Sequence, residues 1–156
     1  MRSVVLRGLS AKEGAARQLI AEDSQAPAQI LEALSRCPEV SVRRAVAVNP
    51  ATPPICLRSL AKDSDVDLRR LIARSRAVSC EALDILSGDT ELEVRLGVVA
   101  NPNTTATLLT LLSRDQDVEV RRAVAGNSNT PPEVLEVLSH DCLLYTSPSP
   151  RDRTRS

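Results

Sequence analysis

A 26-residue repeat runs through this chain without a gap, and no other feature constrains its fold as strongly. Aligned copies of the first half of the repeat are VRRAVAVNP (42–50), LRRLIARSR (68–76), VRLGVVANP (94–102), VRRAVAGNS (120–128) and a degenerate first copy, ARQLIAEDS (16–24). A fixed period of this size is typical of a solenoid, in which each repeat buries its apolar face only against its neighbours. The period therefore predicts a solenoid of five repeats.

Apolar residues at helical spacing predict a first helix in each repeat. In the copy at 38–63, we expect this helix to begin at Pro38, where the missing N–H has no cost, and to end near Val48. Asn49 follows and is expected to close the helix in the left-handed conformation. The acids that stand just ahead of the same place in the later copies are expected to be N-caps: Asp63, Asp89 and Asp115.

A second helix is predicted to begin with Thr52 as N-cap and Pro53 as its first residue. In the last copy, Thr130 and Glu133 have the spacing of a capping box. Leucine pairs three residues apart should form the buried column of these helices: Leu31 and Leu34, Leu57 and Leu60, Leu83 and Leu86, Leu109 and Leu112, Leu135 and Leu138. The predicted fold class is all-α, with the second helices either α or partly 3₁₀.

The composition limits the classes of partner. Lys and Arg total 20, as do Asp and Glu, so the formal charge is zero, which argues against general affinity for nucleic acid or an anionic membrane. Aliphatic residues must build the core, because Tyr145 is the only aromatic residue. The N-terminal apolar run is too short for a signal peptide, so we expect a cytoplasmic protein.

No motif for catalysis or metal binding is present in the sequence. The four cysteines, Cys37, Cys56, Cys80 and Cys142, have no metal-ligand spacing, so we expect no metal and no cofactor. The single histidine, His140, lies beside Asp141 and is expected to be a surface residue. We therefore expect no catalytic residue and no enzymatic activity.

Two rows of arginine follow the repeat. The first row has an acid four residues before each arginine, a spacing that favours ion pairs within one helix: Arg17, Arg43, Arg69, Arg95 and Arg121. We expect this row to be structural, through that pairing or through acids of the adjoining repeat. A stripe that holds phosphate or an acidic peptide is the alternative.

The second row lies one residue later, on the side away from the apolar face. Its members, Arg44, Arg70 and Arg122, have valine instead of an acid four residues earlier, and Gln18 and Leu96 interrupt the row. We expect these three side chains to be exposed. They are either a solvated face or the contact surface for an acidic partner, and they are the candidate partner-binding residues.

The pieces VRRAVA, NP, TPP and LxxL with acid-rich turns resemble the leucine-rich repeat variant (LRV) family and, more loosely, HEAT-like repeats. The resemblance covers residues 16–141 and implies a right-handed superhelix of paired short helices. One branch of the family carries an iron–sulfur cluster on an N-terminal group of cysteines. This chain has no such group, so the cluster does not carry over.

The sequence predicts three segments. Residues 1–15 would be an N-terminal half repeat, because LRGLSAKEGAARQLIA (6–21) mirrors LRSLAKDSDVDLRRLIA (57–73), and residues 16–141 would be the five-repeat array. The segment 142–156 abandons the register, is rich in Ser, Pro and Arg, and resembles translated adaptor sequence. We expect this segment to be a disordered, non-native tail, and the natural protein to continue with further repeats.

A curved helical stack without chemistry is typical of a protein-interaction scaffold. We therefore expect a monomeric scaffold with a protein partner, acidic in character, and no membrane partner. Two alternatives are a nucleic-acid-binding repeat that uses the arginine rows, disfavoured by zero charge and missing aromatics, and a repeat fragment of a larger enzyme or metalloprotein.

Overall fold

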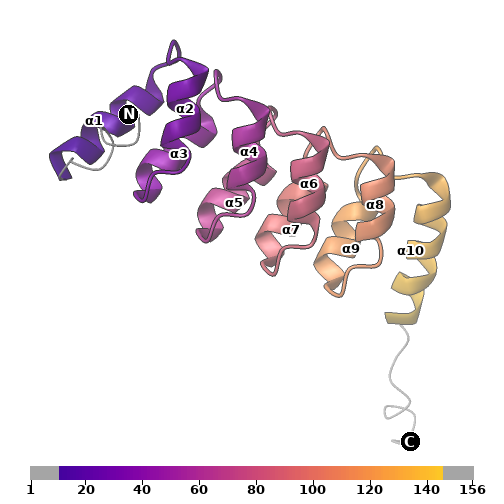
Figure 1. Cartoon of the computed structure of the whole chain (residues 1–156). Helices are drawn as coiled ribbons and strands as arrows, with labels where there is room; N and C mark the ends of the chain where they lie inside the picture. The colour runs from indigo at the N-terminus through magenta and orange to yellow at the C-terminus, as the bar shows by residue number, and fades with distance from the viewer. Residues whose placement is uncertain (1–10, 146–156) are drawn as a thin grey trace, which may run out of the picture. The chain divides into compact units, whose positions relative to one another are not determined.

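The computed structural model describes residues 11–145, and all regular secondary structure in that range is α-helical. The chain divides into two compact units, residues 1–104 and 105–156. The N-terminal unit contains α1 (Ala11–Glu22), α2 (Ala28–Leu34), α3 (Val40–Val48), α4 (Pro54–Leu60), α5 (Val66–Ala73), α6 (Cys80–Ser87) and α7 (Leu92–Val99) (Figure 1). The C-terminal unit contains α8 (Ala106–Leu112), α9 (Val118–Ala125) and α10 (Pro132–Tyr145). The predicted all-α class is confirmed for the described residues.

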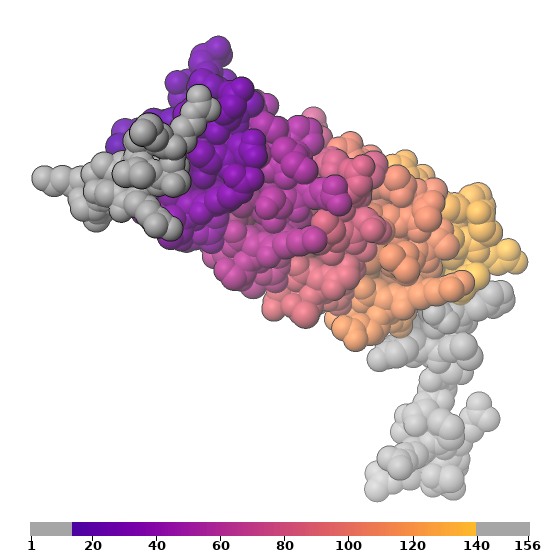
Figure 2. All heavy atoms as spheres, in the orientation of Figure 1, coloured from indigo at the N-terminus to yellow at the C-terminus, as the bar shows by residue number. Residues whose placement is uncertain are grey.

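The helices of the N-terminal unit form two rows. Helices α1, α3, α5 and α7 pack side by side in one row, and α2, α4 and α6 lie in the other (Figure 1). Each even-numbered helix also contacts the odd-numbered helix that follows it, so every pair shares a core with the next pair. In the space-filling view, side chains of successive pairs meet along the face shown (Figure 2). In the C-terminal unit, α9 contacts both α8 and α10.

Aliphatic side chains fill the core, as the helical spacing predicts. Val42 and Val46 of α3 are fully buried, and so are their equivalents Leu68, Ile72, Val94, Val98, Val120 and Val124. The leucine column is buried in α2, α4, α6 and α8. Burial of one such side chain stabilises the fold by roughly 1.5–3 kcal/mol. The column ends at α10, where Val134 and Leu138 are buried while Leu135 is 38% exposed.

The first helix of each repeat begins later than we predicted from Pro38 and from the acids Asp63, Asp89 and Asp115. Helix α3 begins at Val40 with Glu39 as N-cap, so Pro38 lies outside it. Asp63 is not an N-cap: its carboxylate accepts the N–H of Asp65, and Asp65 is the N-cap of α5, accepting from Leu68 at 2.7 Å. The same correction applies to Asp89 and Asp115, which accept N–H groups from Glu91 and Asp117. These acids are two residues too early to reach the helix and close a turn before it.

The second helices also begin one residue later than predicted. Pro53 is the N-cap of α4, and Thr52 Oγ1 donates instead to Val46 O at the end of α3, at 2.5 Å. Thr130 Oγ1 donates in the same way to Val124 O at 2.6 Å, so it does not cap α10 as a capping box requires. Helices α2, α4, α6, α8 and α10 are all α rather than 3₁₀.

The described range includes only parts of the predicted half repeat (1–15) and of the predicted tail (142–156). Helix α10 continues through Tyr145, four residues into the segment predicted as the tail, and residues 146–156 lie outside the described range. Residues 1–10 of the predicted half repeat, and the side chains of His140 and Cys142, lie outside it as well. Within residues 11–145, no helix has the length and apolarity that crossing a membrane requires.

Candidate functional site: the groove between α3 and α5

The first arginine row ties neighbouring helix pairs together. Arg43 Nε lies 2.7 Å from Asp63 Oδ2, and Arg69 Nε lies 2.6 Å from Asp89 Oδ2, in each case across 20 residues of sequence. These four side chains are largely buried. The predicted structural role of Arg43 and Arg69 is therefore confirmed, through an acid of the adjoining repeat. The acid four residues earlier is not the partner.

The remaining N–H groups of these arginines hold the turn before their own helix. Arg43 Nη1 donates to Cys37 O and Pro38 O, each at 2.8 Å. Equivalent bonds run from Arg69 to Asp63 O and Ser64 O, from Arg95 to Asp89 O and Thr90 O, and from Arg121 to Asp115 O and Gln116 O. Donors on both edges of the guanidinium are thus engaged, which explains the recurrence of arginine, because a lysine ammonium cannot span both partners.

The carboxylates of these pairs are held ionised. The hydrogen bond from Arg43 is the main cause that lowers the pKa of Asp63. Burial opposes ionisation of Asp89, but the hydrogen bond from Arg69 and that from the backbone N–H of Glu91 together lower its pKa. In the first repeat Cys37 occupies the place of the acid, and Arg17 pairs with Glu39 at 3.0 Å instead. Burial raises the pKa of the Cys37 thiol, so this cysteine is not an activated nucleophile.

The second arginine row lies closer to the surface, as the sequence predicts. The Arg70 side chain is 39% exposed against 13% for Arg69. Arg44 Nη2 lies 2.8 Å from Asp65 Oδ1 and 3.2 Å from Asp67 Oδ2, and Arg70 also binds Asp67. All three members have an acidic partner at a position other than four residues earlier, since Arg122 in the C-terminal unit binds Glu119 at 2.9 Å. Asp67 and Glu119 lie three residues before their arginines, a pairing visible in the sequence.

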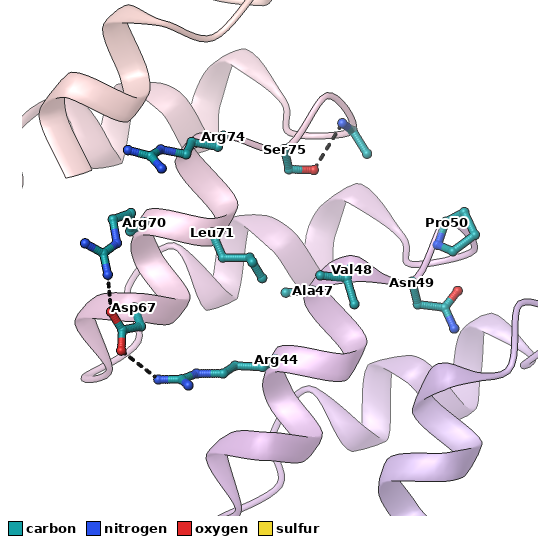
Figure 3. Close-up of a pocket in the computed structure, with 11 residues that line it drawn as sticks. Arg44, Ala47, Val48, Asn49, Pro50, Asp67, Arg70, Leu71, Arg74 and Ser75 are labelled. Carbon is teal, nitrogen blue, oxygen red and sulfur yellow. Dashed lines mark hydrogen bonds and ion pairs between the residues drawn. The ribbon is translucent and has the colours of Figure 1, made fainter. Parts of the chain in front are cut away.

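Arg44 and Arg70 line a groove of about 660 Å³ between α3 and α5 (Figure 3). The third guanidinium of the groove, that of Arg74, is 3.6 Å from Glu93. Its other lining residues are Ala47, Val48, Asn49, Pro50, Asp67, Leu71, Ser75 and Ala77. Arg122 belongs to the other compact unit and lies outside this lining, so the groove unites two of the three candidate partner-binding residues.

Leu71 lies between α3 and α5, the two walls of the groove. It extends from α5 toward Ala47 and Val48 of α3 (Figure 3). The equivalent position on α7 is Gly97, where an added Cβ would lie only 3.0 Å from Ala73 Cβ of α5. Glycine therefore permits close contact between α5 and α7, whereas a leucine stands at the same place between α3 and α5.

Asparagine side chains clamp successive turns together, except at this groove. Asn49 Nδ2 donates to Ala21 O and Asp23 O at 2.7 and 2.8 Å, and Asn101 Nδ2 donates to Ala73 O and Ser75 O at 2.6 and 2.9 Å. Both asparagines are buried, and Asn49 has φ −70°, so it does not close α3 in the left-handed conformation as predicted. What Asn49 and Asn101 share is a side-chain amide that donates to two carbonyl groups of the preceding turn.

Ser75 occupies the place of this asparagine in the repeat that forms the groove. Its hydroxyl accepts the N–H of Ala77 at 3.2 Å, and it makes no bond to the preceding turn. Three residues later, Val78 replaces the threonine that elsewhere donates back to the first helix. The turn at 75–78 is held from the other side, since Asn103 Nδ2 donates to Arg76 O and Val78 O.

The arrangement offers binding chemistry. Its walls present guanidinium donors, one carboxylate and two exposed aliphatic side chains. Among the residues that the structure describes, no three His, Cys, Asp or Glu side chains gather as a metal site. A smaller hollow of about 330 Å³ lies between α2 and α4 and carries Arg36 and Arg58.

Residues 118–141, which form α9 and most of α10, match the family model described as leucine rich repeat variant. The match confirms the resemblance in this segment, where VRRAVA and TPP occur. No curated protein and no solved structure gives a match to the chain. The family is one of helical repeats, in agreement with the all-helical structure of residues 11–145.

Proposed function

We propose that the chain is a non-enzymatic repeat scaffold that binds an acidic segment of a partner protein in the groove between α3 and α5. The observation that carries the proposal is the gathering of three arginines on the groove lining with a single aspartate. Asp65 and Glu93 pair with Arg44 and Arg74 from outside the lining. Complementary charge on a partner gives specificity and speeds association, even where each surface ion pair contributes little affinity.

The proposed architecture is a right-handed solenoid of 26-residue repeats. Equal sequence separations support it: the Asn49 and Asn101 clamps each span 28 and 26 residues, and the Arg43 and Arg69 ion pairs each span 20. The ion pairs therefore recur after one repeat and the asparagine clamps after two, as a regular array of repeats requires. Such an array presents its helices as a continuous surface, which suits extended segments of partner proteins.

Charge reversal tests the proposal. The double variant Arg44→Glu/Arg70→Glu should weaken binding of a fluorescein-labelled, glutamate-rich dodecapeptide by at least about tenfold in fluorescence anisotropy. The neutral double variant Arg44→Gln/Arg70→Gln should weaken it less. Both proteins should retain helical circular dichroism, because these side chains lie at the surface of the α3–α5 pair.

The matched control is Arg36→Glu/Arg58→Glu, which reverses two charges on the hollow between α2 and α4. This variant should bind the peptide as the unchanged protein does. Equal losses in both double variants would mean that only net charge matters. Tight binding of a single-stranded oligonucleotide, with no binding of any acidic peptide, would favour a nucleic-acid-binding repeat instead.

A further inference from the structure

The missing clamp at position 75 distinguishes the groove from the other junctions in the N-terminal unit. At the α1–α3 junction the donor is Asn49, and at the α5–α7 junction it is Asn101. At the α3–α5 junction Ser75 has a shorter side chain, and its hydroxyl is bound within its own turn. The groove therefore lies where one repeat has lost its bond to the turn before it.

The loss leaves one main-chain acceptor in the groove without a donor. Ala21 O and Ala73 O receive the asparagine amides at the other two junctions, and Ala47 O is their equivalent. Main-chain donors do not replace the amide, because Pro50 has no N–H and the N–H of Ala51 is bound to Asn49 Oδ1 at 2.8 Å. Carbonyl groups that receive no protein donor take one from water or from a ligand.

Two aliphatic side chains flank this acceptor. Val48 is 61% exposed although it ends a helix that is otherwise packed, and Leu71 is 37% exposed on the opposite wall. Both line the groove, and Leu71 points across the space between α3 and α5 toward Ala47 and Val48 (Figure 3). An apolar side chain placed between them would remove apolar surface from water on both walls.

The guanidinium groups lie around the same space. Arg44 and Arg70 share Asp67 at one end, and Arg74 extends from α5 on the same side as Arg70 (Figure 3). Their donors are incompletely used: Arg70 makes one ion pair and Arg74 makes one at 3.6 Å. A carboxylate can accept two parallel bonds from a guanidinium, so Arg70 and Arg74 can each bind a further acidic side chain. Arg44 already binds Asp65 and Asp67 through Nε and Nη2, and offers the donors of Nη1.

A donor N–H, an apolar side chain and flanking carboxylates occur together in an acidic peptide with one aliphatic residue. We propose that the groove binds such a peptide in extended form, with the aliphatic side chain between Val48 and Leu71 and its main-chain N–H donated to Ala47 O. The carboxylates of neighbouring residues pair with Arg44, Arg70 and Arg74. This inference rests on the proposed function and adds the feature that makes this junction, and not the others, the binding site.

Restoring the clamp tests the inference. Ser75→Asn supplies the amide that Ala47 O lacks and should occupy the acceptor as Asn101 occupies Ala73 O. We expect this variant of the full chain to melt at a higher temperature and to bind a labelled dodecapeptide of glutamates around one leucine at least about tenfold more weakly. Ser75→Ala removes the hydroxyl but leaves the acceptor open, and should lose much less binding than Ser75→Asn.

A change in the peptide gives a second test that does not depend on how a protein variant folds. Methylation of the leucine amide nitrogen removes the donor, so the unchanged protein should bind the methylated peptide about tenfold more weakly. The Ser75→Asn protein should not distinguish the two peptides. A peptide of glutamates alone should bind more weakly than the leucine peptide, because it leaves Val48 and Leu71 uncovered.

Each failure has a separate meaning. If Ser75→Asn and amide methylation leave binding unchanged while Arg44→Glu/Arg70→Glu abolishes it, the inference is wrong and the proposed function stands. If no acidic peptide binds the unchanged protein, both are wrong. Stronger binding of the leucine-free peptide would also overturn the inference, since it would show a charge-only surface.

Discussion

The turns at 49–52 and 75–78 occupy the same place in consecutive repeats, yet they are held in opposite ways. The first turn is held by its own side chains: Asn49 donates to Ala21 O of the preceding repeat, and Thr52 Oγ1 donates to Val46 O. The second has Ser75 and Val78 at these places, and side chains of the next turn hold it instead. A repeat array can thus give up the bonds of one turn without losing its register, because neighbours supply support from one side.

The comparison shows where binding chemistry can arise in a chain without catalytic motifs. A repeat whose main-chain groups are all bound internally offers only its exposed side chains to a partner. The turn at 75–78 leaves Ala47 O without an amide donor, and the adjoining groove carries three arginines. Departure from the repeat pattern therefore marks the candidate site better than the pattern itself does.

Removal of a clamp should have the largest effect on stability. Asn49→Ala leaves Ala21 O and Asp23 O without their amide donor, and we expect it to lower the free energy of unfolding by about 2–4 kcal/mol. Urea denaturation followed by circular dichroism measures the change. Ser75→Ala, at the equivalent place, should change it by under about 0.5 kcal/mol. Equal losses would show that the two turns are not held differently.

The ion pairs Arg43–Asp63 and Arg69–Asp89, in the two repeats compared, should respond alike to acid. Because Asp63 and Asp89 have lowered pKa values, they contribute stability that is fully present above the ordinary aspartate pKa of about 3.9 and is lost as the pH falls through the lower folded value. Asp63→Asn and Asp89→Asn should each cost about 1.5–3 kcal/mol at pH 7. Both should flatten the loss of stability below about pH 4, in urea titrations at several pH values.

The control for this prediction is Ser75→Asn, which restores a neutral amide and leaves both ion pairs in place. It should shift the whole stability curve upward without changing its slope against pH. A changed acid slope in this variant would show that the two turns differ in charge pairing as well as in neutral hydrogen bonds.

An exchange of Thr52 and Val78 tests the hydroxyl bond alone, because the two side chains have nearly the same shape. Thr52→Val should lower the free energy of unfolding by about 1 kcal/mol, since Val46 O loses the hydroxyl donor and keeps only the N–H of Asn49. Val78→Thr should raise it by up to about 1 kcal/mol by supplying the hydroxyl that this turn lacks. Thermal unfolding measures both. A loss in both variants would mean that Val78 is placed by packing and not by a lost bond.

Much of the fold could be predicted from the sequence, because a strict period repeats the same local information. The all-helical class, the two helices per repeat and the buried leucines follow from apolar spacing. The first residues of the helices were harder to predict, because an aspartate such as Asp63 can either cap a helix or close the turn before it. In the structure Asp63 closes the turn. The role of Asn49 was missed for another reason: its partners lie 26 and 28 residues away, beyond any local pattern.

The site was predicted only in part. The exposure of Arg44 and Arg70 follows from their angle to the apolar face, but their acidic partners do not follow from a rule that considers only residues four positions away. The groove depends on Leu71 facing Ala47, a contact between repeats. One signal for it is present in the sequence: RSR at 74–76 stands where VNP and ANP occur in the two adjoining copies. This departure predicts a changed junction, although not its chemistry.

The smallest effect on stability is expected at Arg70, in the helix that precedes the turn at 75–78. Arg70 is partly exposed and pairs with Asp67 within one turn of α5, and such surface pairs contribute about 0.2–1 kcal/mol. Arg70→Ala should therefore change the free energy of unfolding by under about 0.5 kcal/mol, whereas Arg69→Ala should cost several times more because Asp89 would remain buried without its partner. Urea denaturation of both variants gives the ratio. If Arg70→Ala is the more costly of the two, the exposed row stabilises the α3–α5 junction and is not reserved for a partner.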